Sequence, residues 1–136
     1  MYKIFKIYTD GASRGNPGLA SIGVVIKDND GKTIATLKKK IGVATNNQAE
    51  YQALLYGLEK AHNLKCTEVH CYLDSKLVVE QLNQRYKIKN PDLAKIFLKI
   101  WNFKFNFQKI FFSHIEREQN SEADALANAA LDEEEI

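Results

Sequence analysis

Residues 1–41, MYKIFKIYTDGASRGNPGLASIGVVIKDNDGKTIATLKKKI, hold three strand-forming segments separated by two turn signals. The segments are rich in β-branched and aromatic residues, which favour strands. Residues 11–18 contain three glycines and a proline, so we expect them to break the first strand. Asp30-Gly31 is typical of a hairpin turn. The fold is therefore predicted to open with three antiparallel strands, at residues 2–9, 20–27 and 33–41.

The remaining sequence alternates between helical and strand patterns. Thr45 or Asn46 can cap the first helix, and Pro91 suits a first helical turn. Asn120-Ser121 is expected to cap the last helix. The predicted elements are a helix at 46–63, a strand at 68–73, helices at 75–86 and 91–103, a strand within 104–114 and a helix at 121–131. The order βββαβααβα predicts an α/β fold with a five-stranded mixed sheet flanked by helices.

Length and composition exclude several classes of protein. A chain of 136 residues fits one domain, at 1–131, followed by a short acidic tail at 132–136. Hydrophobic residues make up 45% and charged residues 26%, which argues against disorder and collagen-like structure. No apolar run approaches the length of a membrane span, and residues 1–10 lack the features of a signal peptide. We therefore expect no membrane partner.

Two cysteines, Cys66 and Cys71, do not form a CxxC pair. A zinc site with His70 is conceivable, but the spacing is wrong and a fourth ligand is missing. Buried free thiols are the favoured interpretation, and they point to a reducing, cytoplasmic setting.

The net charge of +2 hides an asymmetry along the chain. Residues 1–115 hold 18 Lys and Arg against nine acids, a balance of +9. Residues 116–136 hold one Arg and eight acids, a balance of −7. The body of the protein is therefore basic enough to attract a phosphate backbone, and such binding should weaken as salt rises.

Four acids stand out by their positions. Asp10 and Asp74 each end a predicted strand, where a solvated turn or cap is the ordinary interpretation. Glu50 begins a helical face continued by small or apolar residues at i+3, i+4, i+7 and i+8. Favourable interaction with the helix dipole is the alternative for Glu50. Asp124 follows Ser121 at the spacing of a capping box, but it shares a face with Ala127.

Convergence of these acids would require a cation, because their mutual repulsion would otherwise raise their pKa values. Oxygen-only ligands suit Mg²⁺ or Mn²⁺ rather than zinc. Two such ions can stabilise both the attacking and the leaving oxygen of a phosphate ester. Metal-dependent phosphoryl chemistry is the hypothesis that follows.

Four sequence blocks resemble the type 1 ribonuclease H family and cover nearly the whole chain. They are YTDGASRGNPG at 8–18, TNNQAEYQALL at 45–55, DSKLVV at 74–79 and REQNSEADALA at 117–127. The resemblance implies a ribonuclease H-like fold, with Asp10, Glu50, Asp74 and Asp124 as the metal-binding, catalytic acids. It also implies cleavage of the RNA strand of an RNA–DNA hybrid, with two ions per site and with 5′-phosphate and 3′-hydroxyl products.

The same resemblance implies a set of substrate-binding residues. Amide side chains suit the minor groove of a hybrid because they donate to and accept from 2′-hydroxyls and base edges. Thr45 matches a residue that grips a phosphate of the DNA strand, and Ser13 lies along the RNA strand. The implied groove residues are Asn16, Asn46 and Asn47, although Asn46 can also cap a helix.

Two features depart from the common bacterial pattern of the family. Residues 84–92 are too short to hold the long basic protrusion, so the chain resembles the short form of the family. The loop before Asp124 resembles the archaeal-type branch, in which Arg117 assists catalysis. Ungapped counting instead matches His114 to the bacterial histidine, so both residues are candidates.

Two other functions compete with the nuclease. A degenerate domain would bind hybrid without cutting it, but such domains usually lose one of the acids. A related integrase or resolvase would share the fold, but the Asn46-Asn47 pair argues against it. We expect a monomer that acts on RNA–DNA hybrid, with double-stranded RNA as a second possible substrate.

Overall fold

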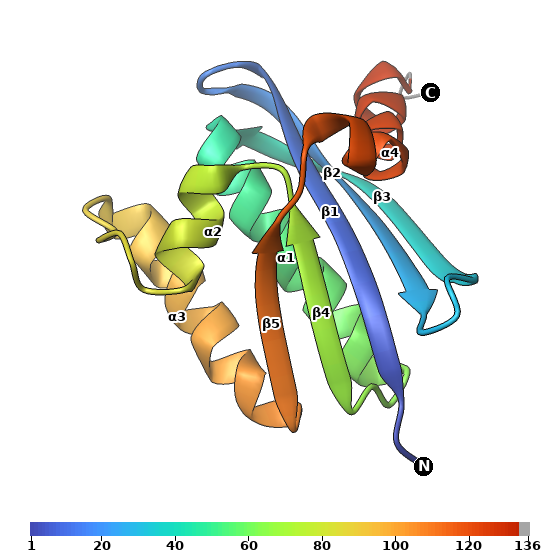
Figure 1. The fold of residues 1–136 in the computed structure, drawn as a ribbon. Coiled ribbons are helices and arrows are strands. Elements are labelled where there is room, and N and C mark those ends of the chain that lie inside the picture. The colour runs from blue at the N-terminus through green and yellow to red at the C-terminus, as the bar shows by residue number, and fades with distance from the viewer. Residues whose placement is uncertain (134–136) are drawn as a thin grey trace.

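In the computed structural model, which describes residues 1–133, a five-stranded sheet carries helices on both faces (Figure 1). The strands lie in the order β3-β2-β1-β4-β5. The pairs β1–β2 and β2–β3 are antiparallel, whereas β1–β4 and β4–β5 are parallel. The strands are β1 (Ile4–Gly15), β2 (Gly18–Asp28), β3 (Thr33–Ala44), β4 (Glu68–Leu73) and β5 (Lys109–His114). The predicted mixed sheet and α/β class are confirmed.

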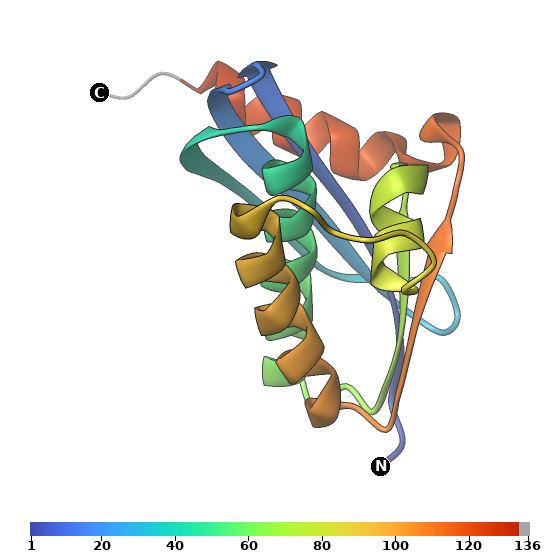
Figure 2. The same ribbon diagram turned by 90° about the vertical axis from the view of Figure 1, so that its left-hand side faces the viewer.

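The helices divide between the two faces of the sheet. The α-helices are α1 (Asn46–Asn63), α2 (Lys76–Leu82), α3 (Pro91–Phe103) and α4 (Ser121–Asp132), and the short 3₁₀ turns are η1 (Lys104–Asn106) and η2 (Arg117–Asn120). Helix α1 packs on β1 and β2 with α3 behind it, whereas α4 crosses the other face over β1, β2 and β3. Asp132 at the C-terminal end of α4 contacts Arg14 in the β1–β2 hairpin, and Figure 2 shows both segments at the same end of the sheet.

The two faces of the sheet are packed differently. Large side chains fill the α1 side, where Ile7, Val24 and Leu54 are fully buried. The α4 side is packed with small residues, so the helix approaches the strands closely. A side chain at Gly23 would place its Cβ 2.1 Å from the Ala123 carbonyl oxygen. Glycine at this position is therefore needed for α4 to dock on β2.

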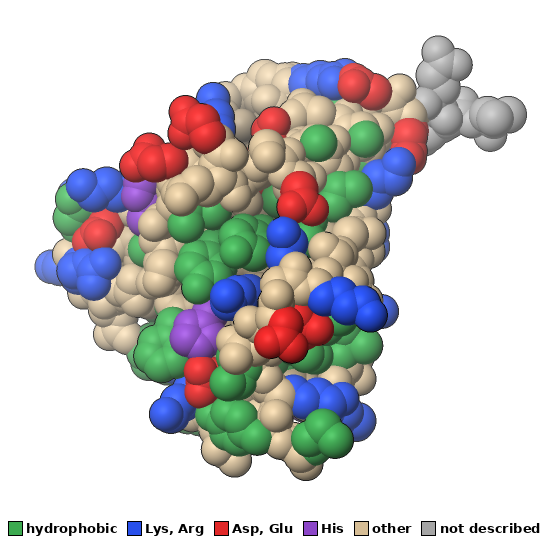
Figure 3. Space-filling view, turned by 45° about the vertical axis from the view of Figure 1, so that its right-hand side comes forward, with side chains coloured by type: hydrophobic (Ala, Val, Ile, Leu, Met, Phe, Trp, Pro, Cys, Tyr) green, Lys and Arg blue, Asp and Glu red, His purple; other side chains and the backbone are tan. Residues whose placement is uncertain are grey.

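Helix α4 leaves part of its face of the sheet uncovered. There Tyr8 stacks on Tyr72 with ring centroids 5.1 Å apart, and His70 stacks on Phe111 at 4.8 Å. The ammonium group of Lys27 lies 5.3 Å from the centre of the Tyr8 ring. Figure 3 shows hydrophobic side chains exposed among charged ones on this side of the molecule.

Strand β1 is longer than the sequence predicts. The glycine-rich segment continues the pairing with β2 as far as Gly15 and Gly18 instead of breaking the strand. The prediction that Asp10 ends a strand is therefore wrong: Asp10 lies within β1, opposite Gly23. The antiparallel partner strand supplies hydrogen bonds along the whole segment, which outweighs the low strand propensity of glycine.

Helix α2 is shorter than predicted and ends at Leu82 rather than near Tyr86. Gln84 has a φ of 61°, and the amides of Arg85 and Tyr86 both donate to the Glu80 carbonyl oxygen. This left-handed residue reverses the chain and ends the helix.

The cysteines and the single tryptophan lie in the framework of the fold. Cys66 and Cys71 are buried free thiols, as predicted. Trp101 on α3 stacks on Phe97 with ring centroids 5.7 Å apart, and the Lys104 ammonium lies 3.8 Å from its ring centre. Among the described residues, no helix combines the length and apolar character that crossing a membrane requires.

Candidate active site

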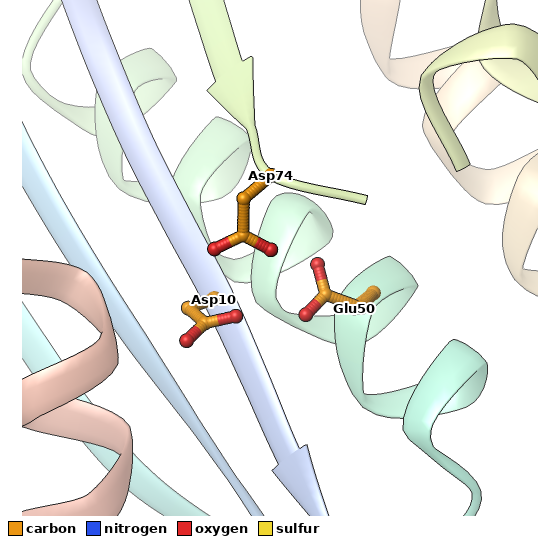
Figure 4. A group of neighbouring side chains, drawn as sticks. All are labelled: Asp10, Glu50 and Asp74. Atoms are coloured by element: carbon orange, nitrogen blue, oxygen red, sulfur yellow. The ribbon is translucent and has the colours of Figure 1, made fainter. Parts of the chain in front are cut away.

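Three carboxylates converge where β1, α1 and the end of β4 meet. Asp10 comes from β1, Glu50 from α1, and Asp74 follows directly after β4. One carboxylate oxygen from each residue lies within 4.8 Å of one from each of the others. Figure 4 shows the three carboxylates turned toward one another. The fold thus brings together acids that are 40 and 24 residues apart in the sequence.

Local geometry explains how α1 delivers Glu50. The Thr45 hydroxyl accepts from the Gln48 amide at 3.1 Å, and the Gln48 side chain accepts from the Thr45 amide at 2.8 Å. This capping box fixes the start of the helix. Helix α1 then passes directly over Gly11, where a Cβ would lie 2.3 Å from the Ala49 carbonyl carbon. The close approach allows the Gly11 amide to donate to Glu50 Oε1 at 3.0 Å.

The parallel pair β1–β4 delivers the other two acids. Paired residues run from Ile4 and Glu68 to Tyr8 and Tyr72. Asp10 and Asp74 therefore follow the last paired residues by two positions on each strand. Ligand sites commonly form at such carboxyl ends of parallel strands.

The site is buried and electrostatically unfavourable without a cation. Asp10 is 6% exposed and Glu50 is 7% exposed. Burial, together with the neighbouring carboxylates, raises the pKa of Asp10 far above its usual range. Burial also raises the pKa of Glu50, and the Gly11 amide and Arg117 offset part of that increase. The folded chain thus holds carboxyl groups that ionise fully only when positive charge is supplied.

One buried atom indicates what could supply this charge. Glu50 Oε2 is buried and has no hydrogen-bond partner among the described residues. A buried acceptor left unpaired is costly. Oxygen ligands within 4.8 Å of one another suit a hard divalent cation. The donor set therefore fits Mg²⁺ or Mn²⁺ and lacks the sulfur and nitrogen ligands typical of zinc.

Asp124 lies at the edge of this cluster. It comes from the first turn of α4 and lines the same pocket. It stands outside the three-carboxylate group, and its Oδ1 accepts from the Asn128 amide at 3.2 Å. The capping-box interpretation of Asp124 is wrong, because Asn120 rather than Ser121 occupies the N-cap position.

The helix-dipole interpretation of Glu50, the solvated-turn interpretation of Asp10 and the cap interpretation of Asp74 are also wrong. Glu50 lies beyond the first turn of α1, so the helix dipole does not explain it. Asp10 is buried within a strand rather than in a solvated turn. Ser75, and not Asp74, caps α2 by accepting from the Val78 amide at 3.3 Å.

The pocket around the acids contains several of the residues predicted to bind substrate. Ser13, Asn46 and Asn47 line it, and Arg117 reaches it from η2. The remaining lining residues are Gly11, Ala12, Ser75 and Asn128. Asn128 is a lining residue that the sequence motifs do not indicate, although it follows Asp124 by four residues and therefore shares its helix face.

Two predicted substrate residues, Asn16 and Thr45, and one candidate, His114, are not among the residues that line the pocket. Asn16 Oδ1 accepts from the Asn46 amide at 3.0 Å, while Thr45 caps α1. Both residues thus support Asn46 and Asn47 rather than lining the pocket themselves. His114 is exposed, and its Nε2 atom lies 3.2 Å from the Asp74 carbonyl oxygen. It does not line the pocket either.

Comparison with known proteins gives concordant results. A family model described as reverse transcriptase-like matches residues 8–130. The chain is 46% identical to a bifunctional protein of Mycobacterium tuberculosis and 42% identical to ribonuclease HI of Halobacterium salinarum, in each case over 93% of this chain. It spans only 35% of the length of the mycobacterial protein and 63% of that of the halobacterial one.

Solved structures extend the match to the whole fold. The crystal structure of RNase H1 from Halobacterium salinarum aligns with a TM-score of 0.93 at 41% identity, over 95% of this chain and 98% of that one. The crystal structure of LC11-RNase H1 in complex with RNA/DNA hybrid aligns with a TM-score of 0.90 at 44% identity, over 94% and 96% of the two chains. On these grounds, the chain belongs to the ribonuclease H family.

Proposed function

We propose that this chain is a metal-dependent endoribonuclease that cleaves the RNA strand of RNA–DNA hybrids and leaves 5′-phosphate and 3′-hydroxyl ends. The observation that carries the proposal is the group formed by buried Asp10 and Glu50 with half-buried Asp74, in which one Glu50 oxygen is unpaired. Family membership supports the same reaction. A degenerate binding module would have no reason to retain such an unfavourable group of acids.

The metal ligands in this proposal are Asp10, Glu50, Asp74 and Asp124, which hold two Mg²⁺ or Mn²⁺ ions in the substrate complex. Two such ions, when bound, supply positive charge for activating water and for the leaving 3′-oxygen. The Gly11 amide orients Glu50 by its hydrogen bond to Oε1. Asp124 would complete the ligand set from the edge of the group, where its Oδ1 accepts from Asn128.

Arg117 is the cationic residue of the pocket in this scheme. Its guanidinium lies close enough to Glu50 to lower the pKa of that carboxyl, in partial compensation for burial. A guanidinium suits a phosphate because it donates in a planar fork. We assign Arg117, rather than His114, the role of assisting at the scissile phosphate, because only Arg117 lines the pocket.

Substrate recognition is assigned to the opposite wall of the pocket. Asn46 and Asn47 contact the minor groove, while Asn16 holds the Asn46 backbone and Thr45 holds the start of α1. Ser13 donates to the Ala44 carbonyl oxygen at 2.8 Å and so joins the β1–β2 hairpin to that wall. The hybrid bound to LC11-RNase H1 supports RNA–DNA hybrid as the substrate class.

The proposal extends to the setting of the enzyme. We also propose a monomer as the active unit. The two buried free thiols favour a cytoplasmic location. The catalytic domain spans residues 1–131. Of the acidic tail at 132–136, Asp132 ends α4 and contacts Arg14, whereas residues 134–136 lie outside the described residues.

A cleavage assay with three labelled duplexes tests the function. The expected result is Mg²⁺- or Mn²⁺-dependent cutting of the RNA strand of the hybrid, with no cutting of duplex DNA. Activity should vanish in excess chelator and in Asp10→Asn. Cutting of double-stranded RNA would widen the substrate class, since 2′-hydroxyls are then present on both strands. Binding of hybrid without cutting, or cutting of DNA, would contradict the proposal.

A further inference from the structure

Asn120 is buried at the start of α4, where it touches the framework of the active site. The residue is only 1% exposed. Its amide nitrogen Nδ2 donates to the Thr9 carbonyl oxygen at 2.9 Å and to Asp74 Oδ2 at 3.0 Å. A single amide group thus connects the residue before Asp10 with the carboxylate of Asp74.

The chemistry of the two partners fixes the orientation of this amide. A backbone carbonyl and a carboxylate can only accept, so the group between them must donate twice. The NH₂ group of asparagine provides two donors on one atom, whereas an ionised carboxylate at the same position could donate neither bond. A flipped amide would place its oxygen against both acceptors.

Asn120 meets these partners at the cost of an ordinary structural role. It occupies the N-cap position of α4, where an asparagine side chain normally accepts a backbone amide of the first turn. No such capping hydrogen bond is made here. Its Oδ1 atom is buried and has no partner among the described residues. The sequence predicts a helix cap at this residue, but the structure uses its side chain elsewhere.

The two hydrogen bonds of Asn120 lie just beyond the end of the pairing between β1 and β4. The parallel pairing of β1 and β4 ends at Tyr8 and Tyr72. Beyond these residues β1 and β4 are no longer paired, although the carboxylates of Asp10 and Asp74 lie close together. The Asn120 amide bridges Thr9 and Asp74 one position past the end of the ladder on β1 and two positions past it on β4. The two hydrogen bonds of Asn120 therefore connect β1 to the segment after β4 at the positions where backbone hydrogen bonds between them have ended.

We propose that Asn120 is a positioning residue for Asp74, which it holds in place for cation binding by fixing one carboxylate oxygen and tying it to β1. This inference rests on the proposed nuclease function. Residues that orient metal ligands in this way commonly affect metal affinity or activity by about 10–100-fold. The effect should therefore fall on metal dependence and turnover, rather than on the binding of hybrid.

The test compares wild type, Asn120→Ala and Asn120→Asp with Gln119→Glu as a matched control. Gln119→Glu adds the same charge as Asn120→Asp at the adjacent residue, and it keeps the oxygen that accepts from the Glu116 amide. For both Asn120 variants, we expect the half-saturating Mg²⁺ concentration to rise by about tenfold or more. The value of kcat should also fall, whereas KM for hybrid at saturating Mg²⁺ should change less than about twofold. Gln119→Glu should resemble wild type.

A second measurement applies to wild type alone, in case the variants fold poorly. In a Mg²⁺ titration followed by NMR without substrate, the side-chain amide signals of Asn120 should shift with the same midpoint as the Gly11 backbone amide. Unmoved Asn120 signals would overturn the inference. So would folded variants with lowered thermal stability but unchanged Mg²⁺ dependence and kcat. If wild type itself fails to cut hybrid, the proposed function fails, and the titration still reports on Asn120 by itself.

Discussion

The acids of the pocket and the acids of the surface lie in opposite electrostatic environments. Several surface acids have cationic partners: Glu80 contacts Arg85 at 2.5 Å, and Glu122 contacts Lys27 at 2.9 Å. The Arg85 guanidinium lowers the pKa of Glu80. In contrast, burial raises the pKa of Asp10. Ion pairs with lysine and arginine are thus formed by acids that lie outside the pocket.

The pocket acids lack such pairing although the chain is rich in lysine. Arg117 is the only cationic residue that lines the pocket within the described part of the chain. Mutual repulsion and burial of these carboxylates lower the stability of the folded chain. Such a group of acids is expected where the side chains have a functional role. The pocket acids are therefore expected to bind a cation from solution, whereas the paired surface acids are not.

The largest effect is expected from replacing a pocket acid with its amide. Asp10→Asn should lower the rate of hybrid cleavage by about 10³-fold or more, because it removes a ligand at the centre of the charge cluster. Single-turnover kinetics at saturating Mg²⁺ measure this. The matched surface change Glu122→Gln removes only an exposed ion pair and should leave the rate within about twofold. Equal losses in the two variants would abolish the contrast.

A second variant tests how the backbone holds the pocket. Gly11→Ala places a methyl group against the backbone of α1, so the helix must move away and take Glu50 with it. We expect a loss of about 1–3 kcal/mol in the free energy of unfolding, together with reduced cleavage. Urea denaturation measures the stability. Gly57→Ala is the control, since a Cβ there would meet side-chain methyl groups at 3.1–3.4 Å rather than the backbone, and Glu50 should stay in place.

The pH dependence of stability should reveal the unpaired acids directly. A raised pKa in the folded state means that the folded chain binds more protons than the unfolded chain, so stability falls as pH rises. The pKa values of Asp10 and Glu50 are both raised from ordinary values of 3.8 and 4.5, so the loss begins above these ordinary values and continues until the carboxyls of the folded chain are ionised. Without metal, Tm should fall by roughly 3–6 °C between pH 5 and pH 9.

Added Mg²⁺ should reverse this trend, because it binds the ionised carboxylates and so stabilises the folded chain more at high pH. Asp10→Asn should flatten the metal-free profile. Differential scanning calorimetry in matched buffers measures both effects. A metal-free Tm that rises steadily from pH 5 to pH 9 would show that the pocket acids are not the strained groups we describe.

The smallest effect is expected at the far end of α4, where Asp132 contacts Arg14 and Glu133 contacts Lys38. Asp132→Asn should release Arg14, which lies next to Ser13, and tighten hybrid binding by about twofold at low salt. The gain should disappear at high salt. Fluorescence anisotropy in Ca²⁺ measures the affinity. Glu59→Gln, at an exposed position on α1, changes the net charge by the same amount. A similar increase in hybrid affinity in that variant would assign the effect to overall charge.

Much of the fold could be predicted because the sequence patterns are local. Alternating strand residues and the Asp30-Gly31 turn determine the β1–β2–β3 meander, and Pro91 marks the start of α3. The length of β1 could not be predicted, because pairing with β2 and the close approach of α1 to Gly11 outweigh the low strand propensity of glycine. The end of α2 likewise depends on the left-handed Gln84, which propensity does not indicate.

The site was predictable in composition but not in arrangement. Helical periodicity placed Glu50 on a buried face, and the structure confirms that burial. Neither periodicity nor spacing could tell that Asp124 lies outside the three-carboxylate group, because α4 docks on the opposite face of the sheet. The tertiary bonds of Asn120 were also hidden, since an asparagine before a helix looks like a cap from sequence alone.

The stacked aromatic pair on α3 has a practical consequence. Trp101 is the only tryptophan in the chain, and it lies against Phe97 and Lys104, while no residue of α3 lines the pocket within residues 1–133. Its fluorescence should therefore report the packing of α3 and should not change when a cation binds to the acids of the pocket. The protein thus carries an intrinsic optical probe whose signal separates loss of structure from loss of ligand.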